Sequence, residues 1–145
     1  MTDMQAALGI SQLSKLNKFI EKRQSIAQIY SKAFEKYDGI TTPSIKSDIQ
    51  HAYHLYPLLI DFKYFGVNKV QFFQEMKKRD INLQVHYIPV HLQPFYKKNY
   101  GCKEGDHPVS EDFYQREVSL PIYPDLMKED QERVISEIKE LLNLK

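Results

Sequence analysis

The amino-acid sequence predicts an α/β domain in two layers, with helices packed on a small sheet. Apolar residues recur at helical spacing in four separate segments, which predicts four amphipathic helical regions. Shorter segments between them are rich in Tyr, Leu and Ile or alternate between apolar and polar residues, which is typical of strands. The predicted order is helix, strand, helix, strand, helix, short strand, helix, and such an order places helices against a sheet. A length of 145 residues is that of one domain.

The first helical region covers residues 3–37. Thr2 and Gln5 have the spacing of a capping box, in which each side chain bonds to the other residue's backbone N–H. Apolar residues then follow at helical intervals, with room for a break near residues 11–14. Asp38 and Gly39 end the region, because glycine favours the backbone conformation that terminates a helix.

The middle of the chain predicts two strands around one helix. Residues 40–48 are a loop, and residues 51–62 form a strand in which Pro57 favours an edge position or a bulge. Asn68 caps the following helix. Residues 82–87 alternate between apolar and polar side chains, which predicts a second strand.

The C-terminal third predicts two helices with a short strand between them. Pro89 and Pro94 break the chain after the second strand into short turns. We expect a helix over 110–117, an extended stretch over 118–123, and an amphipathic helix over 128–144.

The composition narrows the classes of function. Hydrophobic residues make up 42% and charged residues 27%, as in ordinary globular proteins, and the net charge of +1 favours neither nucleic acid nor an anionic membrane as partner. No apolar run is long enough to span a bilayer, and the N-terminus lacks the pattern of a secretory signal. One cysteine excludes an internal disulfide framework. We therefore expect a cytoplasmic protein.

The stretch QVHYIPVHLQPFY, residues 84–96, carries the strongest chemical signal. Its two histidines have no acidic neighbour within the stretch, whereas a zinc site needs three or four ligands, so we predict no metal site. The chain shows no nucleophile motif and no glycine-rich phosphate loop, so we assign no catalytic residue. Aromatic rings, imidazoles and an amide suit a sugar or uracil ring, but they equally suit plain packing, and both interpretations stay open.

Five ordered segments bring in a family resemblance. They are TDMQAALGISQL, FIEKRQSIAQIY, HLYPLLID, VHYIPVHLQPFY and SLPIYPDLMKEDQERVISEI. Together they resemble the C-terminal portion of the DegT/DnrJ nucleotide-sugar aminotransferases, which are pyridoxal-phosphate (PLP) enzymes of the aspartate-aminotransferase fold (fold type I). The form VHYIPVHLQPFY is most similar to the branch of UDP-4-amino-4,6-dideoxy-N-acetyl-β-L-altrosamine transaminases in pseudaminic acid biosynthesis.

The resemblance implies that residues 1–145 are the small domain of such an enzyme, with a mainly antiparallel sheet. Residues 1–37 would be a helical junction to a large PLP-binding domain, and residues 38–145 the α/β subdomain. The family enzyme transfers an amino group from glutamate to a UDP-4-keto-6-deoxy-hexosamine for surface glycans. In the family, the large domain supplies the Schiff-base lysine and most of the PLP site, and no lysine here sits in that motif. We therefore expect no PLP binding and no activity from this chain alone.

The resemblance also implies a substrate-facing wall. The His-Tyr pair ends a family strand near the mouth of the active site, a second histidine follows, and the next loop meets the nucleotide sugar. The residues matched to substrate binding are His86, Tyr87, His91, Phe95, Tyr96, Lys97 and Lys98.

Two expectations concern partners. A UDP-sugar would bind through the full-length enzyme. Met4, Ala7, Leu8 and Leu13 would be partly uncovered without the large domain, so we expect self-association through the N-terminal helix. The alternative function is a standalone α/β binding or interaction module without catalysis.

Overall fold

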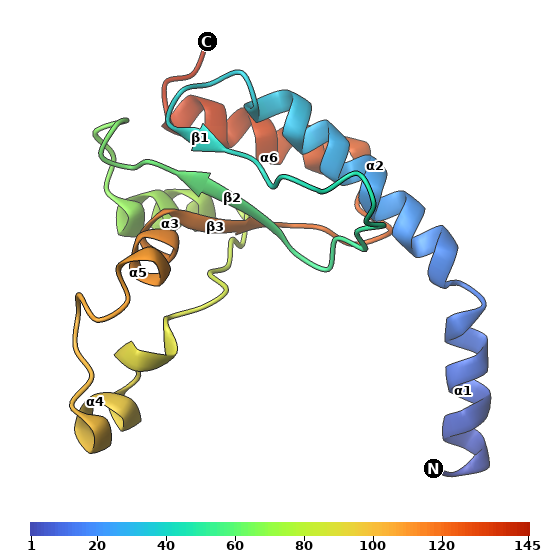
Figure 1. Ribbon diagram of the computed structural model, residues 1–145. Coiled ribbons are helices and arrows are strands. Elements are labelled where there is room, and N and C mark those ends of the chain that lie inside the picture. The colour runs from blue at the N-terminus through green and yellow to red at the C-terminus, as the bar shows by residue number, and fades with distance from the viewer.

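A three-stranded antiparallel sheet lies at the centre of the fold, with strand order β1-β2-β3 (Figure 1). The computed structural model describes all 145 residues. The elements are α1 (Asp3–Leu13), α2 (Leu16–Phe34), β1 (Ile40–Thr41), β2 (Tyr56–Ile60), α3 (Lys69–Lys78), the 3-10 helix η1 (Val90–Leu92), α4 (Pro94–Tyr100), α5 (Pro108–Arg116), β3 (Glu117–Leu120) and α6 (Lys128–Leu141). The predicted fold class, α/β with helices packed on a small antiparallel sheet, is confirmed.

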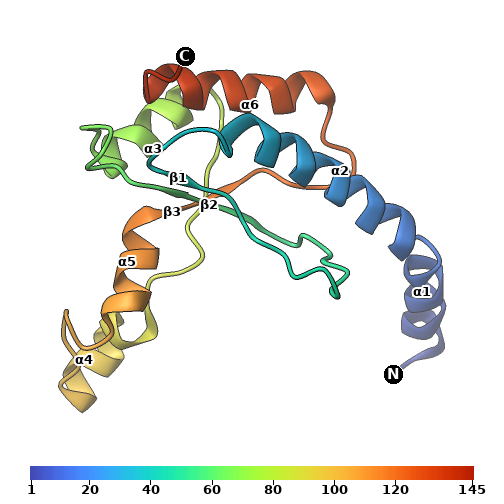
Figure 2. The ribbon, with the colours of Figure 1, turned by 45° about the horizontal axis from the view of Figure 1, so that its top comes forward.

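The helices are not distributed evenly around the sheet. Helices α2, α3 and α6 cover one face, whereas α5 and α4 extend away from the opposite side (Figure 2). Helix α1 projects from the other end of the molecule, and it has no buried residue. The fold therefore has a packed body and two projecting ends.

The body is built around one apolar core. In β2 the residues Tyr56, Leu58 and Ile60 are buried, as the alternation of a strand requires. Helices α2, α3 and α6 contribute apolar stripes to the same core, and all four residues of β3 are buried. Burial of such residues is the main favourable term in folding.

The capping signals read from the sequence are present. Thr2 Oγ1 accepts the Gln5 N–H at 3.3 Å, and Gln5 Oε1 accepts the Thr2 N–H at 2.9 Å. The Asn68 side chain accepts the Gln71 N–H at 3.1 Å and so begins α3. The predicted break in the first helical region falls between α1 and α2, at Ser14–Lys15.

The strand predicted over 82–87 does not form. Only Gln84 pairs with β3: it donates to the Ser119 carbonyl at 3.3 Å and accepts the Ser119 N–H at 2.8 Å. Two residues further on, the His86 N–H bonds to the Glu117 carboxylate instead of a backbone carbonyl. A side-chain acceptor thus replaces the ladder, and the pairing stops after one bridge.

Two smaller predictions concern prolines, and only the second is wrong. Strand β2 is the central strand, yet β1 pairs only with Leu59 and Ile60, so β2 is locally an edge at Pro57 and the missing N–H costs nothing there. Residues after Pro94 were expected to form turns, but Pro94 is the first residue of α4. Proline suits that position because the first helical N–H has no intrahelical partner.

The remaining boundaries shift by a few residues. Helix α5 begins before the predicted 110, and α6 ends at Leu141 rather than 144. Strand β1 lies within the predicted loop 40–48. None of the helices has both the length and the apolar character needed to cross a bilayer.

Candidate functional site

His86 lies beside β3, on a chain of hydrogen bonds that leads into the protein. Its backbone N–H donates to Glu117 Oε2 at 3.0 Å, and its ring Nδ1 lies 2.8 Å from Ser119 Oγ. The Ser119 hydroxyl in turn donates to Glu117 Oε1 at 2.5 Å. Glu117 has no exposed surface and Ser119 is 4% exposed. Both residues belong to strand β3, so a rigid element holds the two side chains that form hydrogen bonds with His86.

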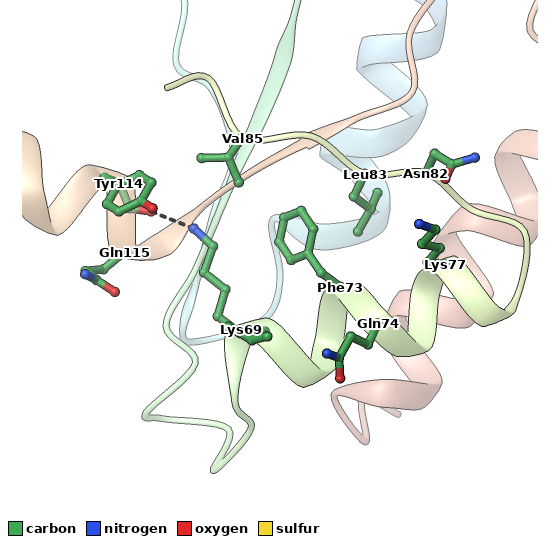
Figure 3. Close-up of a pocket in the computed structure, with 10 residues that line it drawn as sticks. Lys69, Phe73, Gln74, Lys77, Asn82, Leu83, Val85, Tyr114 and Gln115 are labelled. Carbon is green, nitrogen blue, oxygen red and sulfur yellow. Dashed lines mark hydrogen bonds between the residues drawn. The ribbon is translucent and has the colours of Figure 1, made fainter. Parts of the chain in front are cut away.

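Lys69 supplies positive charge near this buried carboxylate. The Lys69 ammonium donates to the Tyr114 carbonyl at 2.6 Å (Figure 3). Burial lowers the pKa of Lys69, and the negative charge of Glu117 opposes that shift. The Lys69 ammonium therefore forms a hydrogen bond with a backbone carbonyl and is also influenced by the negative charge of Glu117.

A cavity of about 470 Å³ opens beside Lys69, between α3, the segment 82–85 and α5 (Figure 3). Its walls are Lys69, Val70, Phe73, Gln74, Lys77, Asn82, Leu83, Val85, Tyr114 and Gln115. None of the seven predicted substrate-binding residues lines it. The predicted site and this cavity are thus different places.

His91 is buried in the loop region between the sheet and α4. Its Nε2 lies 2.8 Å from Glu111 Oε1, and its ring packs against that of His107 at 4.6 Å. The Glu111 carboxylate also accepts the backbone N–H groups of Gly105 and His107. The hydrogen bond from Gly105, followed by that from His91, lowers the pKa of Glu111. His91 therefore ties η1 to α5 and positions the loop between them.

Three aromatic rings lie together on the surface of α4. Phe95, Tyr96 and Tyr100 have ring centroids 5.5 to 6.1 Å apart, and Phe95 is 60% exposed. We call these three residues the aromatic arm. Lys97 and Lys98, on the same helix, are exposed and make no ion pair. Helix α4 thus carries both exposed aromatic rings and two lysines without an acidic partner.

The seven predicted residues occupy three places. His86 and the exposed Tyr87 lie at the sheet, with ring centroids 4.7 Å apart and a cis peptide bond between them. His91 is buried against Glu111. Phe95, Tyr96, Lys97 and Lys98 lie on α4, which carries them away from the sheet (Figure 1).

Sequence reasoning missed the partners of these residues. Glu117 and Ser119 are 31 and 33 positions from His86, so no local pattern connects them. One signal was available: Glu117 directly precedes the stretch predicted to be extended, and a charge in a buried strand needs a specific partner. Tyr100 completes the aromatic arm but lies outside the motif that carried the prediction. No group of three or more His, Cys, Asp or Glu side chains has the geometry to hold a metal ion.

Comparison with known proteins gives a family match over most of the chain. The model of the DegT/DnrJ/EryC1/StrS aminotransferase family matches residues 1–139. The uncharacterized protein MJ1066 of Methanocaldococcus jannaschii is 46% identical over 143 residues, which cover 99% of this chain and 37% of that protein. The UDP-4-amino-4,6-dideoxy-N-acetyl-β-L-altrosamine transaminase of Campylobacter jejuni is 38% identical over 130 residues, which cover 90% of this chain and 34% of the transaminase.

A solved structure shows the same fold. Helicobacter pylori PseC, an aminotransferase involved in the biosynthesis of pseudoaminic acid, superimposes with a TM-score of 0.87 at 29% identity. The match covers 99% of this chain and 38% of PseC. The chain therefore spans between 34% and 38% of the length of these three proteins.

Proposed function

The chain belongs to the DegT/DnrJ/EryC1/StrS aminotransferase family, and on that basis we propose that it is the C-terminal domain of a nucleotide-sugar 4-aminotransferase. Within such an enzyme it would supply part of the wall that receives a UDP-4-keto-6-deoxy-hexosamine for surface-glycan biosynthesis. Amino transfer from glutamate would occur on a PLP cofactor held elsewhere in the enzyme. We further propose that the enzyme works in the cytoplasm, as the single cysteine suggests.

We propose that PLP is held outside this chain. A PLP site combines a Schiff-base lysine with an acidic or arginine partner for the pyridine nitrogen. Two lysines line the cavity of about 470 Å³ beside α3, but no Asp, Glu or Arg lines it with them. The better buried of the two, Lys69, already donates to the Tyr114 carbonyl. We therefore assign cofactor binding and catalysis to the part of the enzyme that this chain does not span.

The observation that carries the proposal is the aromatic arm with its free lysines. Exposed rings on a helix gain little for folding, yet they suit stacking on a uracil or sugar ring. An ammonium group beside such rings is a flexible point charge for a diphosphate. His86 and Tyr87 add an imidazole and a phenol at the sheet end of the same segment. These groups match the chemistry of a nucleotide sugar.

NMR titration of the ¹⁵N-labelled chain with UDP-N-acetylglucosamine tests this proposal. We expect the amide signals of Tyr96, Lys97 and Lys98 to shift in a saturable way. Replacing both lysines (K97A/K98A) should weaken binding about 5- to 30-fold, because two exposed charge contacts of about 0.5–1 kcal/mol each are lost.

The matched control is the double variant K77A/K78A on α3, which removes the same charge from another exposed helix face. It should leave the affinity unchanged. Equal weakening in both double variants would show non-specific attraction of a diphosphate to positive charge. No saturable shift anywhere would contradict the proposed substrate wall and favour an interaction module without catalysis.

Residues 1–37 form, in our proposal, the helical junction to the rest of the enzyme. Helix α1 has 11 residues and buries none of them. Isolated helices shorter than about 12–15 residues are marginal in water. A capping box contributes only about 1 kcal/mol. An exposed helix with Met4, Leu8 and Leu13 on its surface therefore needs a cover, and for this chain we propose a second copy of itself.

Sedimentation equilibrium over a range of concentrations tests this association. We expect the average mass to rise with concentration, and Leu8→Glu to abolish the rise by placing a charge in the apolar contact. Val109→Glu is the control, since Val109 is also exposed but lies on α5. A chain that stays monomeric at the highest concentration would contradict association through α1.

A further inference from the structure

The Glu117 carboxylate determines which atoms donate and which accept in the hydrogen bonds that join Glu117, Ser119 and His86. An ionised carboxylate only accepts, and here each oxygen has one donor: the His86 N–H at 3.0 Å and the Ser119 hydroxyl at 2.5 Å.

Ser119 has a single hydroxyl proton, and that proton is committed to Glu117. The side of Ser119 Oγ that faces the His86 ring therefore presents a lone pair. His86 Nδ1 lies 2.8 Å from this oxygen. Two lone pairs at that distance would repel, so Nδ1 must carry a proton. In a neutral imidazole the other nitrogen then has none.

We infer that Glu117 and Ser119 are positioning residues that hold neutral His86 in the Nδ1–H tautomer, so that its Nε2 accepts a hydrogen bond from a hydroxyl or N–H of the bound substrate. This tautomer is the opposite of the one that predominates for free histidine in water. Nε2 has no hydrogen-bond partner within the chain. The identity of the donor as part of a nucleotide sugar rests on the proposed function, whereas the tautomer rests on the chain alone.

His91 provides an internal comparison within the same molecule. Its Nε2, not its Nδ1, faces the carboxylate of Glu111 at 2.8 Å. Because that carboxylate accepts, His91 must carry its proton on Nε2. The two histidines of one motif, five positions apart, are therefore set to opposite tautomers by two different carboxylates.

The experiment is ¹⁵N NMR of the histidine rings in the full 145-residue chain, at a pH where the ring shifts show neutral imidazoles. We expect Nδ1–H for His86 and Nε2–H for His91. Ser119→Ala removes the acceptor and should return His86 to Nε2–H, with His91 unchanged. Observation of Nε2–H for His86 in the unsubstituted chain would overturn the inference.

Glu117→Gln tests the direction of the hydrogen bonds among Glu117, Ser119 and His86 while keeping a side chain of similar size. If the amide oxygen keeps the His86 N–H, the amide NH₂ group must donate to Ser119 Oγ. The Ser119 hydroxyl then donates to Nδ1, and His86 should switch to Nε2–H. A purely structural role for Glu117 predicts no switch in a folded variant. Ser119→Thr keeps a hydroxyl and should retain the Nδ1–H form.

Addition of UDP-N-acetylglucosamine separates this inference from the proposed function. We expect the His86 Nε2 signal to move toward the hydrogen-bonded position while the tautomer stays Nδ1–H. If the Tyr96 and Lys97 amides shift but Nε2 does not, the acceptor role is wrong and the substrate wall stands. If no signal shifts although His86 is Nδ1–H, the proposed function fails and so does the acceptor role, while the positioning by Glu117 and Ser119 holds.

Discussion

Two clusters of three aromatic side chains, one in the body and one on α4, differ in burial and in the hydrogen bonds of their hydroxyl groups. Tyr30 and Tyr56 in the body have no exposed surface, with ring centroids 5.1 Å apart, and Tyr53 lies 6.3 Å from Tyr56. The aromatic arm on α4 has similar ring spacings but remains exposed. Aromatic spacing alone therefore does not distinguish a core from a binding surface.

The hydroxyl groups of the two fully buried tyrosines, Tyr30 and Tyr56, differ from those of the arm. Tyr30 donates to the Pro121 carbonyl at 2.9 Å, and Tyr56 shares a hydrogen bond of 2.9 Å with Ser31. A buried phenol needs such a partner because an unpaired polar group in the core is costly. The side-chain hydroxyl groups of Tyr96 and Tyr100 form no hydrogen bond with the rest of the chain. Their hydroxyl groups are free for water or for a ligand.

The largest expected effect comes from removing one ring of each cluster. Tyr30→Ala should lower the free energy of unfolding by about 3–5 kcal/mol, because it leaves a cavity in the core. Tyr96→Ala should change it by no more than about 0.5 kcal/mol, as for other exposed positions. Urea unfolding followed by circular dichroism measures both.

Similar losses of stability in the two variants would contradict the comparison, since the arm would then be part of the folding core. Full stability of Tyr96→Ala together with weaker binding of UDP-N-acetylglucosamine would support a binding role for the arm. Tyr64→Ala is the matched control, because Tyr64 is also exposed and lies outside both clusters. It should affect neither stability nor binding.

Interactions between residues close in the sequence could be predicted, whereas interactions between distant residues could not. Helices α2, α3 and α6 follow from apolar residues at helical spacing, and the caps at Thr2 and Asn68 follow from local side-chain chemistry. These signals act over three or four residues and are visible without the fold. The alternation at 82–87 is equally local, but a carboxylate 31 positions away from His86 outcompetes the strand partner.

The site shows the same limit. The aromatic and basic residues of α4 and the His-Tyr pair are visible in the sequence, and their roles remain a prediction. The groups that orient them are not visible: Glu111 lies 20 positions from His91, and Ser119 lies 33 positions from His86. Pairings across such distances depend on strand register and loop path, which composition and periodicity do not specify.

A smaller effect concerns the hydroxyl group of Tyr56 at high pH. Burial raises the pKa of Tyr56 from 10.0 to about 12, against the lowering effect of its hydrogen bond to Ser31. Below pH 10 the phenol is neutral in both the folded and the unfolded chain, so its contribution to stability is complete. Between pH 10 and about 12 the unfolded chain loses the proton and the folded chain does not, so stability falls as pH rises.

Tyr56→Phe should therefore cost about 0.5–1.5 kcal/mol at neutral pH, because the hydrogen bond with Ser31 is lost. It should also make the decline in stability above pH 10 shallower, since one group that titrates differently in the two states is gone. Thermal unfolding at intervals from pH 7 to 11 measures both effects. Tyr96→Phe on the exposed arm is the control for the loss of one phenol hydroxyl. An identical alkaline slope in Tyr56→Phe and the unsubstituted chain would show that burial does not raise the pKa of Tyr56, and the buried cluster would lose this distinction from the arm.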